Sequence, residues 1–375
     1  MRVLVTSWSC ALVLGGCAGG SDASPPPPPS PSAADRWASV TAALQAAQPQ
    51  FAGGLTLELM TPEGVVYSRS FGGFSGGTYA PVASASKVVS AAVFLRLAEQ
   101  GVLPLDTQTK SLLVDRQGQP WSGNMGEIRV RHLLSFTAGI SSDVPASEDA
   151  SITLDEAVKR IHDDQSPTAS SPGSYFYYGG ATHLRIAARM AELATGKTWR
   201  QIYDEQLRIP LGWSVQSTYG GAANPNPAGA LVCTGLEYTR FLMMQLRQGM
   251  DGAKRLMTAR SIEQQRADAF VPATTIQYSA YRFLGKAYHY GLGNWLETAN
   301  GQAPSLTNPV NRWSSTGKFG WAPWIAADSS YAGLIMTKQP NLPTSFVPSE
   351  RLKTALEPLI REALSINPPV IRAVP

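Results

Sequence analysis

The chain has 375 residues, of which 43% are hydrophobic and 15% are charged, enough apolar material for a large core in one or two domains. The formal net charge is +4, and the basic residues are scattered rather than grouped in a block, which argues against a nucleic-acid partner. Beyond the N-terminal segment, no stretch approaches the roughly 20 apolar residues that a membrane span requires. The composition therefore indicates a globular protein.

The first 34 residues have the composition of an export signal followed by a tether. Residues 1–17 combine a basic start, an apolar stretch and the sequence Leu14-Gly15-Gly16-Cys17, which is similar to a bacterial lipobox. We therefore predict a lipid anchor at Cys17 on the extracytoplasmic side of a bacterial membrane. An ordinary cleaved signal, with secretion, is the alternative. Residues 18–34 include five consecutive prolines and favour an extended linker over a packed core.

A folded body is expected over residues 35–366, followed by a tail at 367–375. Strand patterns dominate its two ends, whereas about 102–270 is mostly helical. The expected helices are 35–47, 83–100, 153–162, 181–195, 198–207, 234–248, 258–266 and 349–364, and the expected strands are 55–60, 65–71, 288–297, 311–316, 324–327 and 331–338. This order predicts an α/β fold of the α+β type, in which one antiparallel sheet is built from both chain ends, with flanking terminal helices and a helical lobe.

The sequence Ser84-Ala85-Ser86-Lys87 opens an apolar helix. Residues three apart on a helix share a face, so we expect the Ser84 hydroxyl and the Lys87 amine within hydrogen-bonding distance. A lysine in a buried helix can lose its charge and accept the serine proton, and NH groups of the first turn can stabilise an oxyanion. The same four residues also fit a capping serine followed by a surface lysine, so this interpretation needs support from other segments.

Two later segments supply groups that a serine nucleophile needs. Residues 172–180 bring clustered tyrosines to the start of a helix, and a tyrosine near a lysine can relay protons. Residues 313–321 end a strand with small residues, which leaves backbone NH groups accessible to a substrate carbonyl. Taken singly, the tyrosines also fit aromatic packing, and the strand end fits an ordinary edge bulge.

The order and spacing of these three segments resemble the serine β-lactamase and penicillin-binding-protein superfamily, above all class C β-lactamases, D-alanyl-D-alanine carboxypeptidases and family VIII carboxylesterases. The likeness covers about residues 37–340, and it implies the β-lactamase/transpeptidase-like form of the predicted fold. The segments that are similar to family motifs are 130–139, 172–180, 207–212, 228–234 and 290–293.

The resemblance implies roles for the residues at matching positions. Ser84 is expected to be the acylated nucleophile, Lys87 its base and Tyr178 the tyrosine that shares proton transfer. The triplet Ser315-Thr316-Gly317 stands where the family has K-T-G or H-T-G on a substrate-binding strand. The oxyanion hole is expected from the backbone NH groups of Ser84 and Lys318.

Two positions depart from the family pattern. Gly180 replaces the asparagine of the Y-x-N motif, and Ser315 replaces the Lys or His before Thr316. Gly180 has no side-chain donor, and Ser315 carries no charge to attract a carboxylate. Lys318 can replace only part of the missing charge, because its direction along the strand is wrong for a simple substitution. These departures argue against efficient β-lactam turnover and against tight binding of a peptide carboxylate, whereas ester hydrolysis demands less.

We therefore predict a serine hydrolase that cleaves an ester or amide through an acyl-enzyme, most simply a carboxylesterase-like enzyme that acts on a small-molecule, peptide or cell-wall-like acyl substrate. The alternatives are a β-lactamase or D-alanyl-D-alanine carboxypeptidase, and a non-catalytic penicillin-binding-like protein. No cofactor is expected. The four histidines lack the spacing of a metal site, so no metal is expected either.

Overall fold

The computed structural model describes residues 35–365. The predicted signal, the lipid site at Cys17, the tether and the tail at 367–375 all lie outside these residues and stay predictions. None of the helices within 35–365 combines the length and apolar character needed to cross a membrane.

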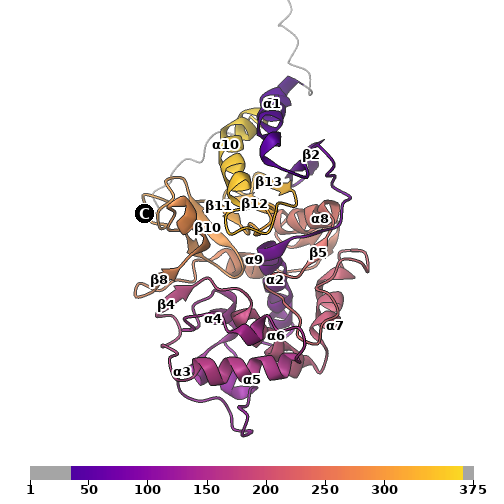
Figure 1. Ribbon diagram of the computed structural model, residues 1–375. Helices are drawn as coiled ribbons and strands as arrows, with labels where there is room; N and C mark the ends of the chain where they lie inside the picture. Colours follow the sequence, from indigo (N-terminus) through magenta and orange to yellow (C-terminus); the bar gives the residue numbers. More distant parts are fainter. Residues whose placement is uncertain (1–34, 366–375) are drawn as a thin grey trace, which may run out of the picture. The chain divides into compact units, whose positions relative to one another are not determined.

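A seven-stranded antiparallel sheet forms the upper part of the body, with the strand order β2-β1-β13-β12-β11-β10-β9 (Figure 1). Strands from the first and last parts of the described chain pair in its interior, where Leu57 of β1 lies opposite Ile335 of β13. The strands are β1 (Leu55–Thr61), β2 (Gly64–Phe71), β9 (His289–Tyr290), β10 (Trp295–Thr298), β11 (Val310–Ser314), β12 (Ala322–Ala326) and β13 (Ala332–Met336). This confirms the predicted fold class.

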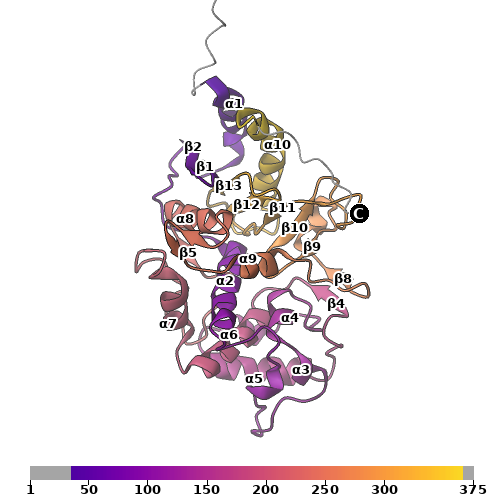
Figure 2. The ribbon, with the colours of Figure 1, turned by 180° about the vertical axis from the view of Figure 1, so that it is seen from behind.

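The two terminal helices, α1 (Ala38–Ala47) and α10 (Val347–Ala363), cover one face of the sheet and lie side by side in both views (Figures 1 and 2). Their buried residues, such as Leu44 and Leu356, form one apolar cluster with the facing strand residues. Helix α8 (Gly235–Leu246) packs against the opposite face. The sheet is therefore apolar on both faces, and nearly every residue of β1, β12 and β13 is buried.

Helix α2 (Ser86–Glu99) connects the sheet to the helical lobe, and it is apolar almost all round because it is buried against both (Figure 1). The other elements are α3 (Gly123–Glu127), α4 (Val130–Leu134), α5 (Leu154–Gln165), α6 (Thr182–Thr195), α7 (Trp199–Tyr203) and α9 (Ala259–Arg266), with the short strands β3 (Ala80–Pro81), β4 (Tyr175–Tyr177), β5 (Val232–Cys233), β6 (Met250–Asp251), β7 (Lys254–Arg255) and β8 (Thr275–Tyr278).

Two predicted elements differ from the structure near the site. The strand expected over 288–297 is two paired strands, β9 and β10, joined by a turn at Gly291 to Asn294. Gly293 has φ 82°, and a Cβ there would lie 2.5 Å from the Lys87 carbonyl oxygen, so the turn packs directly on α2. The helix expected from Ala83 begins as a 3₁₀ turn, η3 (Ala83–Ala85), before α2 starts.

Candidate active site

The candidate nucleophile, Ser84, lies in the 3₁₀ turn η3 that precedes α2. Ala83, the residue before it, has φ 47°, in the left-handed region that alanine rarely adopts. Such strain persists only where the surrounding structure holds it, and it is common at functional sites. The fully buried start of α2 holds the turn in this conformation and presents the Ser84 side chain to a cleft.

The Lys87 side chain contacts Ser84 directly, with 2.9 Å between its Nζ and the Ser84 Oγ. The same Nζ donates to the Ala228 carbonyl oxygen at 3.0 Å, and the residue is only 3% exposed. Burial lowers the pKa of Lys87 to about 7, although the charges of Asp143 and Glu148 act in the opposite direction. Near neutral pH a large fraction of Lys87 is therefore an uncharged amine, whose lone pair can take the serine proton.

Tyr178 follows strand β4 and closes the other side of this pair. Its ring centre lies 4.9 Å from the Lys87 Nζ, and its hydroxyl interacts with the Ser84 side chain. Burial raises the pKa of Tyr178 to about 12, despite the opposing interactions with Ser84, Trp295 and Tyr290. Tyr178 is thus a protonated phenol at neutral pH. Lys87 is the better base of the two, and Tyr178 is suited to pass a proton onward.

The segment that follows strand β11, residues 315–318, lies against the turn that holds Ser84. A Cβ on Gly317 would lie 2.1 Å from the Val82 carbonyl oxygen, so only glycine permits this approach. The Ser315 hydroxyl lies 3.1 Å from the carbonyl oxygens of both Ser84 and Gly293, and its one hydrogen serves these backbone groups. Lys318 is exposed at the cleft, and its backbone NH donates to no acceptor within the described part of the chain.

The Thr316 hydroxyl donates a hydrogen bond to the carboxylate of Glu350, a residue of helix α10. Glu350 also accepts a hydrogen bond of 2.8 Å from the Lys353 ammonium, which is fully buried and contacts Glu297 as well. The Thr316 hydroxyl is the donor in its bond to Glu350, and the Glu350 oxygen accepts its hydrogen. Thr316 can consequently offer a substrate only its lone pairs.

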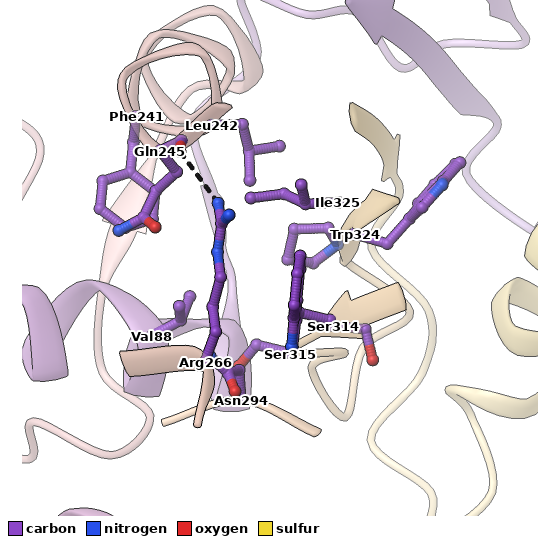
Figure 3. Close-up of a pocket in the computed structure, with 12 residues that line it drawn as sticks. Val88, Phe241, Leu242, Gln245, Arg266, Asn294, Ser314, Ser315, Trp324 and Ile325 are labelled. Atoms are coloured by element: carbon purple, nitrogen blue, oxygen red, sulfur yellow. Dashed lines mark hydrogen bonds between the residues drawn. The ribbon is translucent and has the colours of Figure 1, made fainter. Parts of the chain in front are cut away.

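Four of these residues line a cleft of about 480 Å³, which is large enough for a small-molecule substrate: Ser84, Tyr178, Thr316 and Lys318. The charged residues on its wall are Asp143, Arg282 and Lys318, and aromatic side chains such as Tyr278 and Trp295 form much of the rest. A second space lies behind Ser315, beside the buried Arg266, which donates to the Gln245 carbonyl oxygen at 2.9 Å (Figure 3). Its volume of about 20 Å³ holds no more than one water molecule, so the Ser84 cleft is the candidate substrate site.

The structure brings together Ser84, Lys87, Tyr178 and the segment 315–318, all of which were predicted from the sequence. Three further contributors were not predicted: Asp143 on the cleft wall, the Ala228 carbonyl at Lys87, and Glu350 beneath Thr316. Only Ala228 lies in a segment with a family motif. Within the described residues, no three His, Cys, Asp or Glu side chains gather as metal ligands would.

Comparison with known proteins gives three relevant similarities. A stretch of 149 residues is 31% identical to monacolin J acid methylbutanoyltransferase of Aspergillus terreus; the match spans 35% of this chain and about a third (36%) of that relative. The crystal structure of a candidate β-lactamase from Bacteroides dorei DSM 17855 is similar with a TM-score of 0.69 and 25% identity, over 86% of this chain and 99% of that one. The structure of EstCE1, described as a hydrolase with promiscuous acyltransferase activity, has a TM-score of 0.65 and 17% identity, over 89% of this chain and 98% of that one.

A family model matches most of the chain. The model for Beta-lactamase covers residues 52–355, which include the nucleophile turn, the tyrosine segment and the end of β11. The resemblance seen in the sequence motifs is thereby confirmed, and so is the expectation of an enzyme of the serine hydrolase superfamily. The chain belongs to the beta-lactamase family.

Proposed function

We propose that this protein is a carboxylesterase-like serine hydrolase that works through an acyl-enzyme on Ser84. In this mechanism the Ser84 Oγ attacks the ester carbonyl carbon, and uncharged Lys87 takes the proton of the Ser84 hydroxyl. The NH groups of Ser84 and Lys318 stabilise the resulting oxyanion. When the C–O bond to the alcohol breaks, Tyr178 gives its proton to the departing oxygen and regains one from the Lys87 ammonium, so both groups return to their starting state. Water then cleaves the acyl-enzyme by the reverse sequence. The observation that carries the proposal is the 2.9 Å contact between Ser84 Oγ and a lysine amine whose pKa is lowered to about 7.

The hydroxyls at the end of β11 favour an ester over a β-lactam or a peptide C-terminus. A carboxylate on the substrate requires donors or a positive charge. Ser315 directs its hydrogen to backbone carbonyls, and Thr316 directs its own to Glu350. The cleft wall carries two cations, Lys318, which is exposed, and Arg282, whose guanidinium lies over two aromatic rings, and neither occupies the motif position that Ser315 takes. A neutral ester needs none of these contacts.

Acyl transfer is the second candidate function. The acyl-enzyme is the same, but an alcohol replaces water in its second half. The observation that favours it is the 31% identity to a methylbutanoyltransferase. A non-catalytic penicillin-binding-like protein is the third alternative, since Gly180 and Ser315 depart from the family motifs.

One panel of substrates with matched variants tests these alternatives. Purified protein and its Ser84→Ala and Lys87→Ala variants are incubated with a fluorophosphonate probe, p-nitrophenyl butyrate, nitrocefin and a D-Ala-D-Ala peptide. We expect probe labelling and butyrate turnover in the wild type only, with little nitrocefin or peptide cleavage. Adding a primary alcohol and measuring the new ester reports acyl transfer.

The contrary outcomes are distinct. Full labelling of Ser84→Ala would remove the assignment of the nucleophile. If the fluorophosphonate probe labelled Ser84 but none of the three substrates released a product, the protein would be penicillin-binding-like. Faster turnover of nitrocefin than of the ester would indicate a β-lactamase.

A further inference from the structure

Among the residues that line the Ser84 cleft, Asp143 is the one with a carboxylate. Asp143 belongs to the loop between α4 and α5 and lines the cleft together with Ser84 and Tyr178. The loop is fastened there by hydrogen bonds. The Gly180 NH donates to both carboxylate oxygens at 2.7 Å, and the Thr182 hydroxyl lies 3.3 Å from one of them.

The glycines of the tyrosine segment make room for this carboxylate. A Cβ on Gly179 would lie 2.6 Å from an Asp143 oxygen, and a Cβ on Gly180 would lie 3.5 Å from both. A Cβ at Gly179 would therefore collide with the carboxylate, whereas a Cβ at Gly180 would make ordinary contact with it and with a Glu148 oxygen at 3.4 Å. Position 180 therefore lacks the neutral amide of the motif asparagine. Its backbone NH instead binds the negatively charged carboxylate of Asp143.

Asp143 retains unused capacity to accept hydrogen bonds. A carboxylate has about four acceptor positions, and the Gly180 NH and the Thr182 hydroxyl supply only two hydrogens. None of the ion pairs formed by residues 35–365 includes Asp143. The other charges on the cleft wall are engaged elsewhere or exposed: the Arg282 guanidinium lies over the rings of Tyr278 and Phe283, at 4.1 and 4.9 Å, and Lys318 is exposed.

We propose that Asp143 binds a positively charged group of the substrate, so that the preferred substrate is an ester bearing an ammonium group. This inference rests on the proposed ester hydrolysis and names its substrate class. The cation completes the hydrogen bonding of the carboxylate at the cleft wall. A substrate with a carboxylate in the same place meets a like charge and is disfavoured.

Matched pairs of esters test the inference. On the acyl side, p-nitrophenyl 6-aminohexanoate is compared with p-nitrophenyl hexanoate. On the alcohol side, 4-(aminomethyl)phenyl butyrate is compared with 4-methylphenyl butyrate. Assays at about pH 8 leave most of Lys87 uncharged. The alkylamine of the acyl-side ester, with a pKa of about 10.4, is then protonated, and the less basic benzylic amine of the alcohol-side ester is mostly protonated. The readout is the ratio of kcat/KM between the charged and the neutral member of each pair.

We expect one of the two pairs to favour the ammonium ester by about 10- to 100-fold, the range of a charge-assisted hydrogen bond. Asp143→Asn keeps an oxygen for the Gly180 NH but removes the charge, and it should lower that ratio at least about tenfold. Asp149→Asn, in the same loop but away from the cleft wall, is the matched control and should leave the ratio unchanged.

Two results would overturn the inference. One is equal kcat/KM within both pairs for the wild type. The other is an Asp143→Asn variant in which both members of a pair lose activity equally, since Asp143 would then only position the Gly180 segment. The neutral esters keep the two proposals separate: their Ser84-dependent turnover tests ester hydrolysis, whatever the ratio shows.

Discussion

At the scale of single residues, the chemistry depends on the charge of Lys87. Desolvation favours the neutral amine, whereas the negative charges of Asp143 and Glu148 favour the ammonium. The balance places the pKa of Lys87 at about 7 and leaves the buried phenol of Tyr178 at about 12. Lys87 and Tyr178, whose pKa values are well separated, lie on either side of the Ser84 hydroxyl. This separation assigns the base role to Lys87 and proton relay to Tyr178.

The pH dependence of kcat/KM should report the ionisation of Lys87. Below a pH of about 7 the ammonium form cannot accept a proton, so kcat/KM for a neutral ester should rise tenfold per pH unit and level off above about 7. Removing the charge of Asp143, as in Asp143→Asn, should move this limb to lower pH, because Asp143 raises the pKa of Lys87. Initial rates with p-nitrophenyl butyrate between about pH 5 and 9 measure the acid limb of the wild type and that of Asp143→Asn.

The profile can also contradict the assignment. If Lys87→Ala retained the same acid limb as the wild type, the titrating group would be another residue. A limb that moved to higher pH in Asp143→Asn would have the wrong sign for removal of a negative charge.

The sequence predicted the site residues that contact each other within one turn of the chain. It did not predict those that reach the site from distant segments. Ser84 and Lys87 are three apart, a spacing that brings side chains together in both α and 3₁₀ turns, so the difference at η3 did not matter. Asp143 reaches the cleft only through hydrogen bonds to the Gly180 segment. The donor role of Thr316 depends on Glu350, 34 residues further on, and no periodicity encodes that contact.

At the scale of elements, the site depends on close approaches of the α2 region to two other segments. Gly317 lets the end of β11 meet the residues before Ser84, and Gly293 lets the β9–β10 turn meet Lys87. The second approach explains why one expected strand is two. A continuous strand over 288–297 was a reasonable interpretation of its aromatic and β-branched residues, but the segment Gly291-Leu292-Gly293 forms the turn that supports α2. Helix packing, rather than local preference, determined that break.

Gly317→Ala should therefore impair catalysis more than folding. The added methyl would push β11 away from the Ser84 turn and displace the Lys318 NH, for which we expect a loss of about 10²- to 10³-fold in kcat, the usual effect of losing an oxyanion donor. Overpacking should reduce the free energy of unfolding by about 1–3 kcal/mol. Gly64→Ala, at a glycine with open space around its Cα, is the control. Wild-type kcat in a folded Gly317→Ala protein would exclude a role for this approach.

At the scale of the whole molecule, the body and the first 34 residues raise separate questions. The fold class could be predicted because strand patterns at both ends and helices between them admit few arrangements. The proposed anchor depends on residues 14–17 alone.

We expect Cys17 to be acylated when the full chain is expressed in a bacterium with a lipoprotein pathway. Radiolabelled palmitate should enter the wild-type protein, and the label should be lost in Cys17→Ser but kept in Cys10→Ser. A mature protein that is cleaved and unlabelled would favour the ordinary signal instead. Activity towards p-nitrophenyl butyrate should be the same in all three.

The pairing of β1 with β13 has a consequence for biosynthesis. These neighbours are about 280 residues apart in the chain, so at a translation rate of about 5–20 residues per second the first waits roughly 15 to 55 s for the second. The sheet that supports the end of β11 is incomplete throughout that interval. The body can therefore complete its sheet only after the final strand has left the ribosome, so the last step of its folding is post-translational.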